Sequence, residues 1–168
     1  QSKYLLPFGL MGSVDMAQVM NKPNPRVGLV NIGAEAEKGD RLTHEAYPLM
    51  QAQTSYNFIG NVEARDLLLG ECDVAVTDGF VGNVILKHTE GLAKTLFSMI
   101  KTELTHTTLR AKIGALLVKP TLKNVGRRMD YNAVGGAPLL GVNGAVVKAH
   151  GSSGEEAIEN ALAQARRM

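Results

Sequence analysis

Short apolar runs alternate with longer amphipathic segments along this chain, and the alternation predicts its elements. The first apolar run, residues 26–31, reads Arg-Val-Gly-Leu-Val-Asn and is typical of a buried strand. Two further strands are expected at residues 55–60 and 73–77. Segments with apolar residues three and four positions apart predict helices, which fall at residues 5–20, 40–53, 63–69, 83–103, 109–120, 121–129 and 153–167.

The connection near the end of the chain predicts a β-hairpin. Asn143-Gly144 lies between two short apolar segments, residues 139–142 and 145–148, and this dipeptide favours a tight hairpin turn. Elsewhere the strands alternate with helices, which implies a mostly parallel sheet with helices on both faces. We therefore expect an α/β fold with one antiparallel hairpin, in a single domain that covers residues 1–168.

Composition and charge narrow the class of protein. The net charge is only +2 and the chain has no tryptophan, so neither a basic field nor a stacking surface indicates nucleic-acid binding. One cysteine excludes an internal disulfide and fits a reducing, cytoplasmic compartment. Every apolar run is shorter than the ~18–20 residues that span a bilayer. The chain begins at once with apolar sequence, and we expect it to be a piece of a longer protein.

Polar loops that contain glycine follow the carboxyl ends of the predicted strands. In open α/β sheets, ligands bind at these ends, where glycine lets backbone N–H groups converge on an anion. Gly, Asn and Asp also serve as ordinary turn and cap residues, and Asn61 is expected to cap the helix at 63–69. Four such loops together favour a phosphate site, whose candidate residues are Asn31, Gly33, Asn61, Gly79, Gly82, Gly151 and Ser152. No nucleotide-binding glycine motif is present.

Four charged or polar side chains are candidates for catalysis. Lys38 follows the first strand and would bind phosphate or stabilise developing negative charge, although a lone loop lysine is often only solvated. Asp78 would orient a donor or act as a base, and Asn83 would donate to an oxyanion; both also suit helix capping. His150 is the histidine best placed for proton transfer. Cys72 precedes its strand and lies at the opposite end, and no metal or cofactor is expected.

Residues 107–122 form a basic helical stretch, which we expect to protrude. Its apolar face suits a membrane surface that carries anionic lipid, or, with its basic flanks, an acidic protein partner. The same face would equally pack in a core or at a dimer contact. The residues expected to contact a membrane are Leu109, Ile113, Leu116 and Leu117.

Two longer motifs resemble one known family. Residues 57–66 resemble the N-F-x-G-N-V-E-A-R-[DE] segment of PlsX-type phosphate acyltransferases, and residues 73–83 resemble their D-V-x-V-x-D-G-F-x-G-N segment. Shorter matches occur at residues 129–131, 135–137, 140–141 and 148–153. The resemblance runs in order over essentially the whole chain and corresponds to the C-terminal half of the family. The family's N-terminal half, with its D-A-M-G-G-D opening, is absent.

The resemblance implies an enzyme that moves a fatty acyl group from acyl carrier protein to inorganic phosphate, for phospholipid synthesis. It implies a fold similar to phosphotransacetylases and to isocitrate and isopropylmalate dehydrogenases. It also implies a homodimer bound peripherally to the inner face of the cell membrane, with residues 107–122 in the membrane-contacting hairpin. Lys38 would then face the phosphate or the oxyanion. Two alternatives stay open: an acyl-CoA-dependent transferase similar to phosphotransacetylases, and a non-catalytic membrane-binding or dimerisation module.

Overall fold

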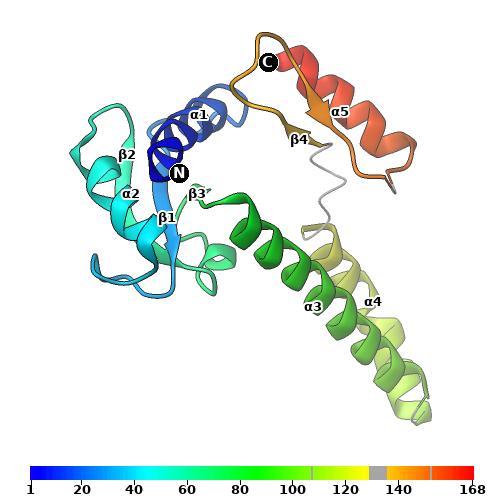
Figure 1. Cartoon of the computed structure of the whole chain (residues 1–168). Coiled ribbons are helices and arrows are strands. Elements are labelled where there is room, and N and C mark those ends of the chain that lie inside the picture. The colour runs from blue at the N-terminus through cyan, green and yellow to red at the C-terminus, as the bar shows by residue number, and fades with distance from the viewer. Residues whose placement is uncertain (107, 129–135, 152) are drawn as a thin grey trace. The chain divides into compact units, whose positions relative to one another are not determined.

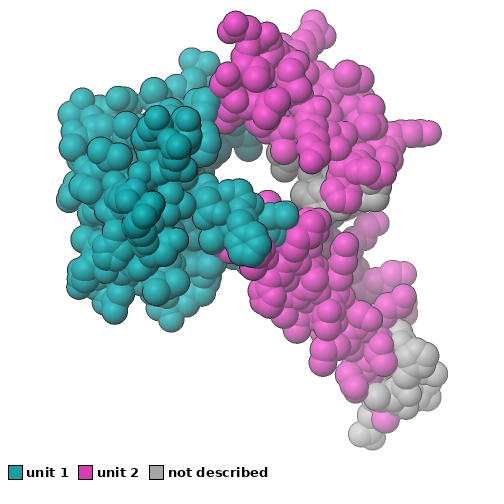
Figure 2. Space-filling model, viewed as in Figure 1, with its two compact units in different colours: residues 1–83 teal, residues 84–168 magenta. Residues whose placement is uncertain are grey.

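The computed structural model describes residues 1–106, 108–128, 136–151 and 153–168, with the backbone alone at 105–106, 109–112 and 127–128. Its chain divides into two compact units, Gln1–Asn83 and Val84–Met168 (Figure 2). The first unit carries the parallel sheet and most of the candidate site. The second unit carries the long helices and the small hairpin.

A three-stranded parallel sheet forms the centre of the first unit. Its strands are β1 (Arg26–Asn31), β2 (Asn57–Glu63) and β3 (Val74–Val76), in the order β2-β1-β3. Helices α1 (Leu5–Gln18) and α2 (Arg41–Ala52) pack on this sheet and contact each other (Figure 1). Short 3-10 helices occur at η1 (Ser2–Tyr4) and η2 (Leu67–Leu69). The predicted α/β class with a parallel sheet is confirmed.

The core of this unit lies between the central strand and the two helices. Val27 and Leu29 of β1 are fully buried, as are Ala46 and Met50 of α2, and Leu5 of α1 joins them. The alternate position Gly28 faces the opposite side, where a Cβ would lie 2.6 Å from Cγ1 of Val62. Burying both faces of β1 explains why its sequence is a nearly continuous apolar run.

A bulge in β2 decides which of its residues face the helices. Val27 pairs with Phe58 but Leu29 pairs with Asn61, so β2 carries one extra residue over this stretch. Gly60 lies in the bulge with φ of +94°, a conformation that glycine adopts without strain. Because side chains alternate along a strand, the extra residue turns Asn61 to the face that Leu29 occupies.

The amino ends of β1 and β3 are joined by a charged cluster. The backbone N–H of Arg26 donates to Oδ2 of Asp73 at 2.8 Å, and its guanidinium donates to both carboxylate oxygens. Lys22 lies 2.7 Å from the same carboxylate. Hydrogen bonds from Arg26 and then Lys22 hold the pKa of Asp73 well below its usual range. The cluster therefore stabilises the end of the sheet opposite the candidate site.

Two long helices lead into the second unit and make up much of it. Helix α3 (Gly79–His106) ends where the chain turns back, and α4 (Leu109–Arg128) follows in the reverse direction, so the pair is a helical hairpin (Figure 1). Strands β4 (Ala137–Pro138) and β5 (Val147–Lys148) pair antiparallel, and α5 (Glu155–Arg167) packs on β5. Among the residues described, no helix has both the length and the hydropathy needed to cross a membrane.

Several predicted boundaries were wrong. The helix expected at 63–69 is replaced by the end of β2 and the short η2, because β1 offers a pairing partner as far as Glu63. Helix α3 begins at Gly79 rather than at residue 83. The helices expected at 109–120 and 121–129 are one helix, α4, since a long helix accommodates Pro120 with the loss of one hydrogen bond. An antiparallel hairpin forms, but its strands are only Ala137–Pro138 and Val147–Lys148. Residues 139–146 connect them, so the tight turn predicted between strands at 139–142 and 145–148 was wrong.

Candidate functional site

The loop after β1 is held at both of its ends by one buried amide. Asn31, the last residue of β1, is only 8% exposed. Its Oδ1 accepts a hydrogen bond from the backbone N–H of Ile32, and its Nδ2 donates to the backbone carbonyl of Lys38, both at 2.8 Å. The side chain thus fixes the first and last parts of the loop. The two amide atoms of Asn31, which we expected to bind phosphate, make these hydrogen bonds within the loop instead.

A second buried amide holds the middle of the same loop. Asn61, turned inward by the β2 bulge, is 7% exposed, and its Nδ2 donates to the backbone carbonyl of Glu35 at 2.8 Å. That carbonyl also accepts from the backbone N–H of Lys38. Oδ1 of Asn61 is buried and accepts no hydrogen bond from any described residue. Asn61 is therefore a strand residue that positions the loop, and the prediction that it caps a helix was wrong.

Lys38 projects from this fixed loop. Its ammonium makes no hydrogen bond or ion pair with any residue that the structure describes. Gly33 lies beneath it: a Cβ there would be 2.9 Å from Cγ of Lys38 and 2.8 Å from a carboxylate oxygen of Glu35. The absence of a side chain at Gly33 lets both charged side chains fold over the backbone. A positive charge carried on a fixed backbone suits an anion site.

The loop passes directly into a capped helix. Gly39 has φ of +107°, and a Cβ at this position would collide with the Thr43 hydroxyl and the Asn31 amide. The next residue, Asp40, accepts from the backbone N–H of Thr43, and Thr43 Oγ1 accepts from the backbone N–H of Asp40. The hydrogen bond from the Thr43 N–H lowers the pKa of Asp40. This reciprocal cap fixes where α2 begins, and with it the end of the loop.

Asp78 is a capping residue at the start of α3. One oxygen of its carboxylate accepts from the backbone N–H groups of Phe80, at 2.8 Å, and Val81, at 3.0 Å. Of the roles considered for Asp78, helix capping is therefore the one observed. Its carboxylate already engages two N–H groups at this end of the helix. Asn83 is exposed and lies within α3, so it is not the cap.

The two glycines expected to bind phosphate at this end differ in their surroundings. Apart from its chain neighbours and its own helix backbone, no described residue has a heavy atom within 4 Å of a Cβ placed at Gly79, whereas one at Gly82 would be 2.8 Å from the methyl group of Thr77. Gly82 is therefore needed for packing. Packing among the described residues gives no reason for glycine at residue 79, which is exposed.

The remaining candidates belong to the second unit or lie outside the described residues. His150 and Gly151 are exposed and follow β5, and the His150 carbonyl accepts from the backbone N–H of Ser153. Ser152 lies outside the described residues. In α4, Ile113, Leu116 and Leu117 are exposed, while the side chain of Leu109 is not described. The described residues contain no group of three His, Cys, Asp or Glu side chains suited to a metal ion.

The structure brings together one part of the predicted site and adds residues that the sequence did not single out. Because β1 and β2 are parallel neighbours, Asn31, Gly33, Lys38 and Asn61 meet at one edge of the sheet. The backbone carbonyl of Glu35 and the backbone of Gly39 were missed. The charge of Glu35 gives no hint of its carbonyl's role, but a glycine directly before a helix cap was a usable signal at Gly39.

Cys72 lies at the other end of the sheet, as predicted, close to Gly28. A Cβ placed at Gly28 would be 3.3 Å from Cβ of Cys72. Burial raises the pKa of the Cys72 thiol, which disfavours the reactive thiolate. The structure thus gives no support to nucleophilic catalysis by this residue.

Comparison with known proteins places the chain in a family. The model of a family described as "Fatty acid synthesis protein" matches residues 1–168. A phosphate acyltransferase of Clostridium acetobutylicum is 51% identical over 163 residues, which are 97% of this chain and 49% of that protein. One of Clostridium perfringens is 52% identical over 165 residues, covering 98% of this chain and 48% of its own length.

A phosphate acyltransferase of Clostridium botulinum is 49% identical over 166 residues, or 99% of this chain and 49% of that protein. The chain thus spans about half the length of the curated relatives it matches. The match covers every element of the candidate site described above, from β1 to the start of α3. The chain is therefore a member of the fatty acid synthesis protein family, the PlsX-type phosphate acyltransferases.

Proposed function

We propose that this chain is the C-terminal half of an enzyme that transfers a fatty acyl group from acyl carrier protein to inorganic phosphate. The observation that carries the proposal is the ammonium of Lys38, which has no partner among the described residues and belongs to a loop that two buried amides hold in place. The relatives are phosphate acyltransferases, which supports phosphate as the acyl acceptor. Acyl carrier protein as the donor, and use of the product in phospholipid synthesis, follow from the motif resemblance.

The reaction needs positioning and charge more than a nucleophilic side chain. An oxygen of phosphate attacks the thioester carbonyl, the new O–C bond forms, and the C–S bond breaks. The thiolate of the carrier then takes up a proton, and acyl-phosphate remains. Both the phosphate and the carbonyl oxygen of the intermediate are anions, and a preorganised cation stabilises such charge at little reorganisation cost. In our proposal Lys38 supplies that cation.

The other candidate residues have supporting roles in the proposal. Asp78 positions the start of α3, where the open backbone at Gly79 and the exposed amide of Asn83 offer hydrogen-bond donors. His150 would move a proton, with Gly151 and Ser152 beside the phosphate. The rest of the cleft would come from the half of the enzyme that this chain does not span.

An assay with two donors tests the proposed reaction. The full-length protein that contains this chain is incubated with inorganic phosphate and either acyl carrier protein or coenzyme A carrying the same acyl group. Acyl-phosphate is trapped with hydroxylamine as the hydroxamate. We expect product from the carrier-protein donor. Product from acyl-CoA alone would indicate a phosphotransacetylase-like enzyme, and product from neither donor would contradict the proposal and favour a non-catalytic module.

We further propose that the α3–α4 hairpin binds the inner face of the cell membrane in a cytoplasmic homodimer. Ile113, Leu116 and Leu117 are exposed on α4, and the exposed Lys119 and Lys123 follow them along the helix. Apolar residues flanked by lysines suit a monolayer with anionic headgroups.

Flotation with vesicles tests this membrane contact. The full-length protein is mixed with vesicles of phosphatidylglycerol and phosphatidylcholine, and Leu116→Glu should abolish flotation. Leu69→Glu changes an equally exposed leucine of the first unit and should leave flotation intact. If Leu116→Glu floats like the wild type but loses the dimer by light scattering, α4 is a subunit contact instead.

A further inference from the structure

Two large apolar side chains stand almost fully exposed at the edge of the sheet that carries the candidate site. Ile32 is 80% exposed and Phe80 is 79% exposed, the highest values among the large apolar side chains that the structure describes. Ile32 directly follows β1, and Phe80 lies in the first turn of α3, shortly after β3. Single exposed apolar residues are common, so exposure alone decides nothing.

Both side chains are held on a fixed backbone. The N–H of Ile32 donates to Oδ1 of Asn31, and the N–H of Phe80 donates to Oδ1 of Asp78, each at 2.8 Å. In both cases the acceptor belongs to a polar residue at the carboxyl end of a strand. The backbone that presents each apolar side chain to solvent is therefore tied down, and the exposure does not come from a loosely held loop.

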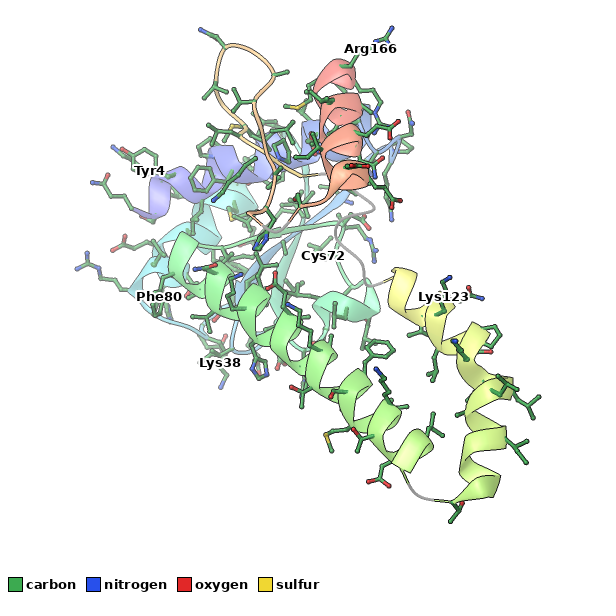
Figure 3. All side chains as sticks on the ribbon, turned by 90° about the vertical axis from the view of Figure 1, so that its right-hand side faces the viewer. Tyr4, Lys38, Cys72, Phe80, Lys123 and Arg166 are labelled. Carbon is green, nitrogen blue, oxygen red and sulfur yellow. The ribbon has the colours of Figure 1, made fainter. Side chains whose placement is uncertain are left out.

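The sheet topology brings the two side chains to the same edge. Strands β1 and β3 are parallel neighbours, with Leu29 opposite Val76. Ile32 and Phe80 each follow shortly after these positions, so both lie beyond the carboxyl ends of adjacent strands. Lys38 belongs to the loop at that edge, and Figure 3 labels Lys38 and Phe80 on the same side of the ribbon. The Lys38 ammonium and two apolar side chains thus share one edge of the sheet.

We propose that Ile32 and Phe80 determine acyl-chain specificity by contacting the alkyl chain of the substrate while its reacting head faces Lys38. The inference rests on the proposed function and adds the part of the site that recognises the chain. The tetrahedral intermediate formed when phosphate attacks an acyl thioester and the acyl-phosphate product both combine an anionic head with an alkyl tail. An edge that presents a cation beside exposed apolar side chains matches both parts.

The main alternative to contact with an alkyl chain is contact with the remaining half of the full-length protein. If that half covers Ile32 and Phe80, both side chains are buried core residues of the whole enzyme. Shortening them would then lower stability and would reduce activity with every substrate to the same extent. Contact with the alkyl chain predicts the opposite pattern, since the loss would grow with chain length and stability would hold.

The test measures kcat/KM of the full-length enzyme with acyl carrier protein carrying chains of four to sixteen carbons. For the double variant Ile32→Ala/Phe80→Ala we expect a loss of about tenfold with the longest chain and less than about twofold with the shortest. Leu69→Ala, which shortens a side chain that is 77% exposed in the same unit, should match the wild type at every length. Thermal unfolding of each variant is measured in parallel.

The outcomes separate this inference from the proposed function. If the wild type forms no acyl-phosphate from any donor, the proposed function fails. If the wild type is active and the double variant loses the same factor at all chain lengths, or unfolds at a much lower temperature, the inference is overturned. Binding of dodecyl phosphate and butyl phosphate by calorimetry gives a second measurement. The double variant should weaken the dodecyl compound alone, and equal weakening of both would also overturn the inference.

Discussion

Replacing Gly39 by alanine tests how tightly the loop after β1 is built. Gly39 has φ of +107°, outside the range that an alanine adopts easily. The added Cβ would collide with the Thr43 hydroxyl, which takes part in the cap of α2, and with the Asn31 amide, which holds both ends of the loop. The substitution therefore strains the backbone and disturbs two sets of hydrogen bonds at once.

The contributions to the loss can be estimated separately. Holding a residue with a side chain in a disfavoured backbone conformation costs about 1–3 kcal/mol. Disturbing the hydrogen bond between Asn31 and the Lys38 carbonyl costs about 1 kcal/mol, and weakening the cap formed by Asp40 and Thr43 costs about 1 kcal/mol more. We expect Gly39→Ala to lower the free energy of unfolding of the unit by roughly 3–5 kcal/mol.

The assay is urea unfolding of the full-length protein, followed by circular dichroism. The matched control is Gly91→Ala in α3, where the added Cβ would have no heavy atom of a described residue within 4 Å apart from its chain neighbours and its own helix backbone. Alanine favours the helix there by about 0.5–1 kcal/mol, so this variant should be slightly more stable than the wild type. A Gly39→Ala protein that unfolds within about 0.5 kcal/mol of the wild type would refute the packing described for this loop.

Three other substitutions test the framework of the first unit by the same unfolding measurement. Leu29→Ala leaves a cavity beneath the helices and should lower the free energy of unfolding by about 3–4 kcal/mol. Gly28→Ala overfills the opposite face of β1 against Val62 and should lower it by about 1–3 kcal/mol. A neutral result for either variant would contradict the central position of β1. Asp73→Asn should destabilise the protein at pH 7, because an amide cannot replace the carboxylate between Arg26 and Lys22. Since the pKa of Asp73 is lowered in the folded state, the wild type has this stabilisation above about pH 4 and loses it as the pH falls further. The variant should therefore approach the wild type in acid, and a constant difference down to pH 2 would be the contrary result.

Elements defined by local signals were predicted well from the sequence. The apolar run at Arg26–Asn31 became β1 with the expected bounds, and α2 begins directly after Asp40, where a capping residue precedes an amphipathic segment. Both depend on interactions within a few residues or on simple burial. Local sequence is sufficient in these cases because no distant partner competes with the local preference.

The errors occurred where a distant partner decides the structure. Gly60-Asn61 reads as a turn followed by a cap, which is what these residue types often form. In the folded chain β1 pairs with β2 beyond this point, so Gly60 becomes a bulge and Asn61 a buried strand residue. The link from Asn61 to the Glu35 carbonyl spans 26 positions, and no pattern along the chain indicates it.

In the candidate site, too, some features could be predicted from local sequence and others depended on contacts that only the structure shows. The place of Lys38 at this edge of the sheet followed from the order of strands and loops, and its role stays a prediction. The choice between a cap and a catalytic role for Asp78 stayed open until its contacts with the backbone of Phe80 and Val81 were known. The exposure of Ile32 and Phe80 could not be read from the sequence, because burial is the ordinary expectation for large apolar side chains.

The dependence of acyl-phosphate formation on phosphate concentration tests the central claim most directly. In the full-length enzyme, Lys38→Ala should lower kcat/KM for phosphate by about 100-fold and leave the unfolding midpoint unchanged, since Lys38 is exposed and its ammonium has no partner among the described residues. Lys3→Ala, another exposed lysine of the same unit, serves as the control and should match the wild type. A Lys38→Ala enzyme with wild-type kcat/KM for phosphate would contradict the account.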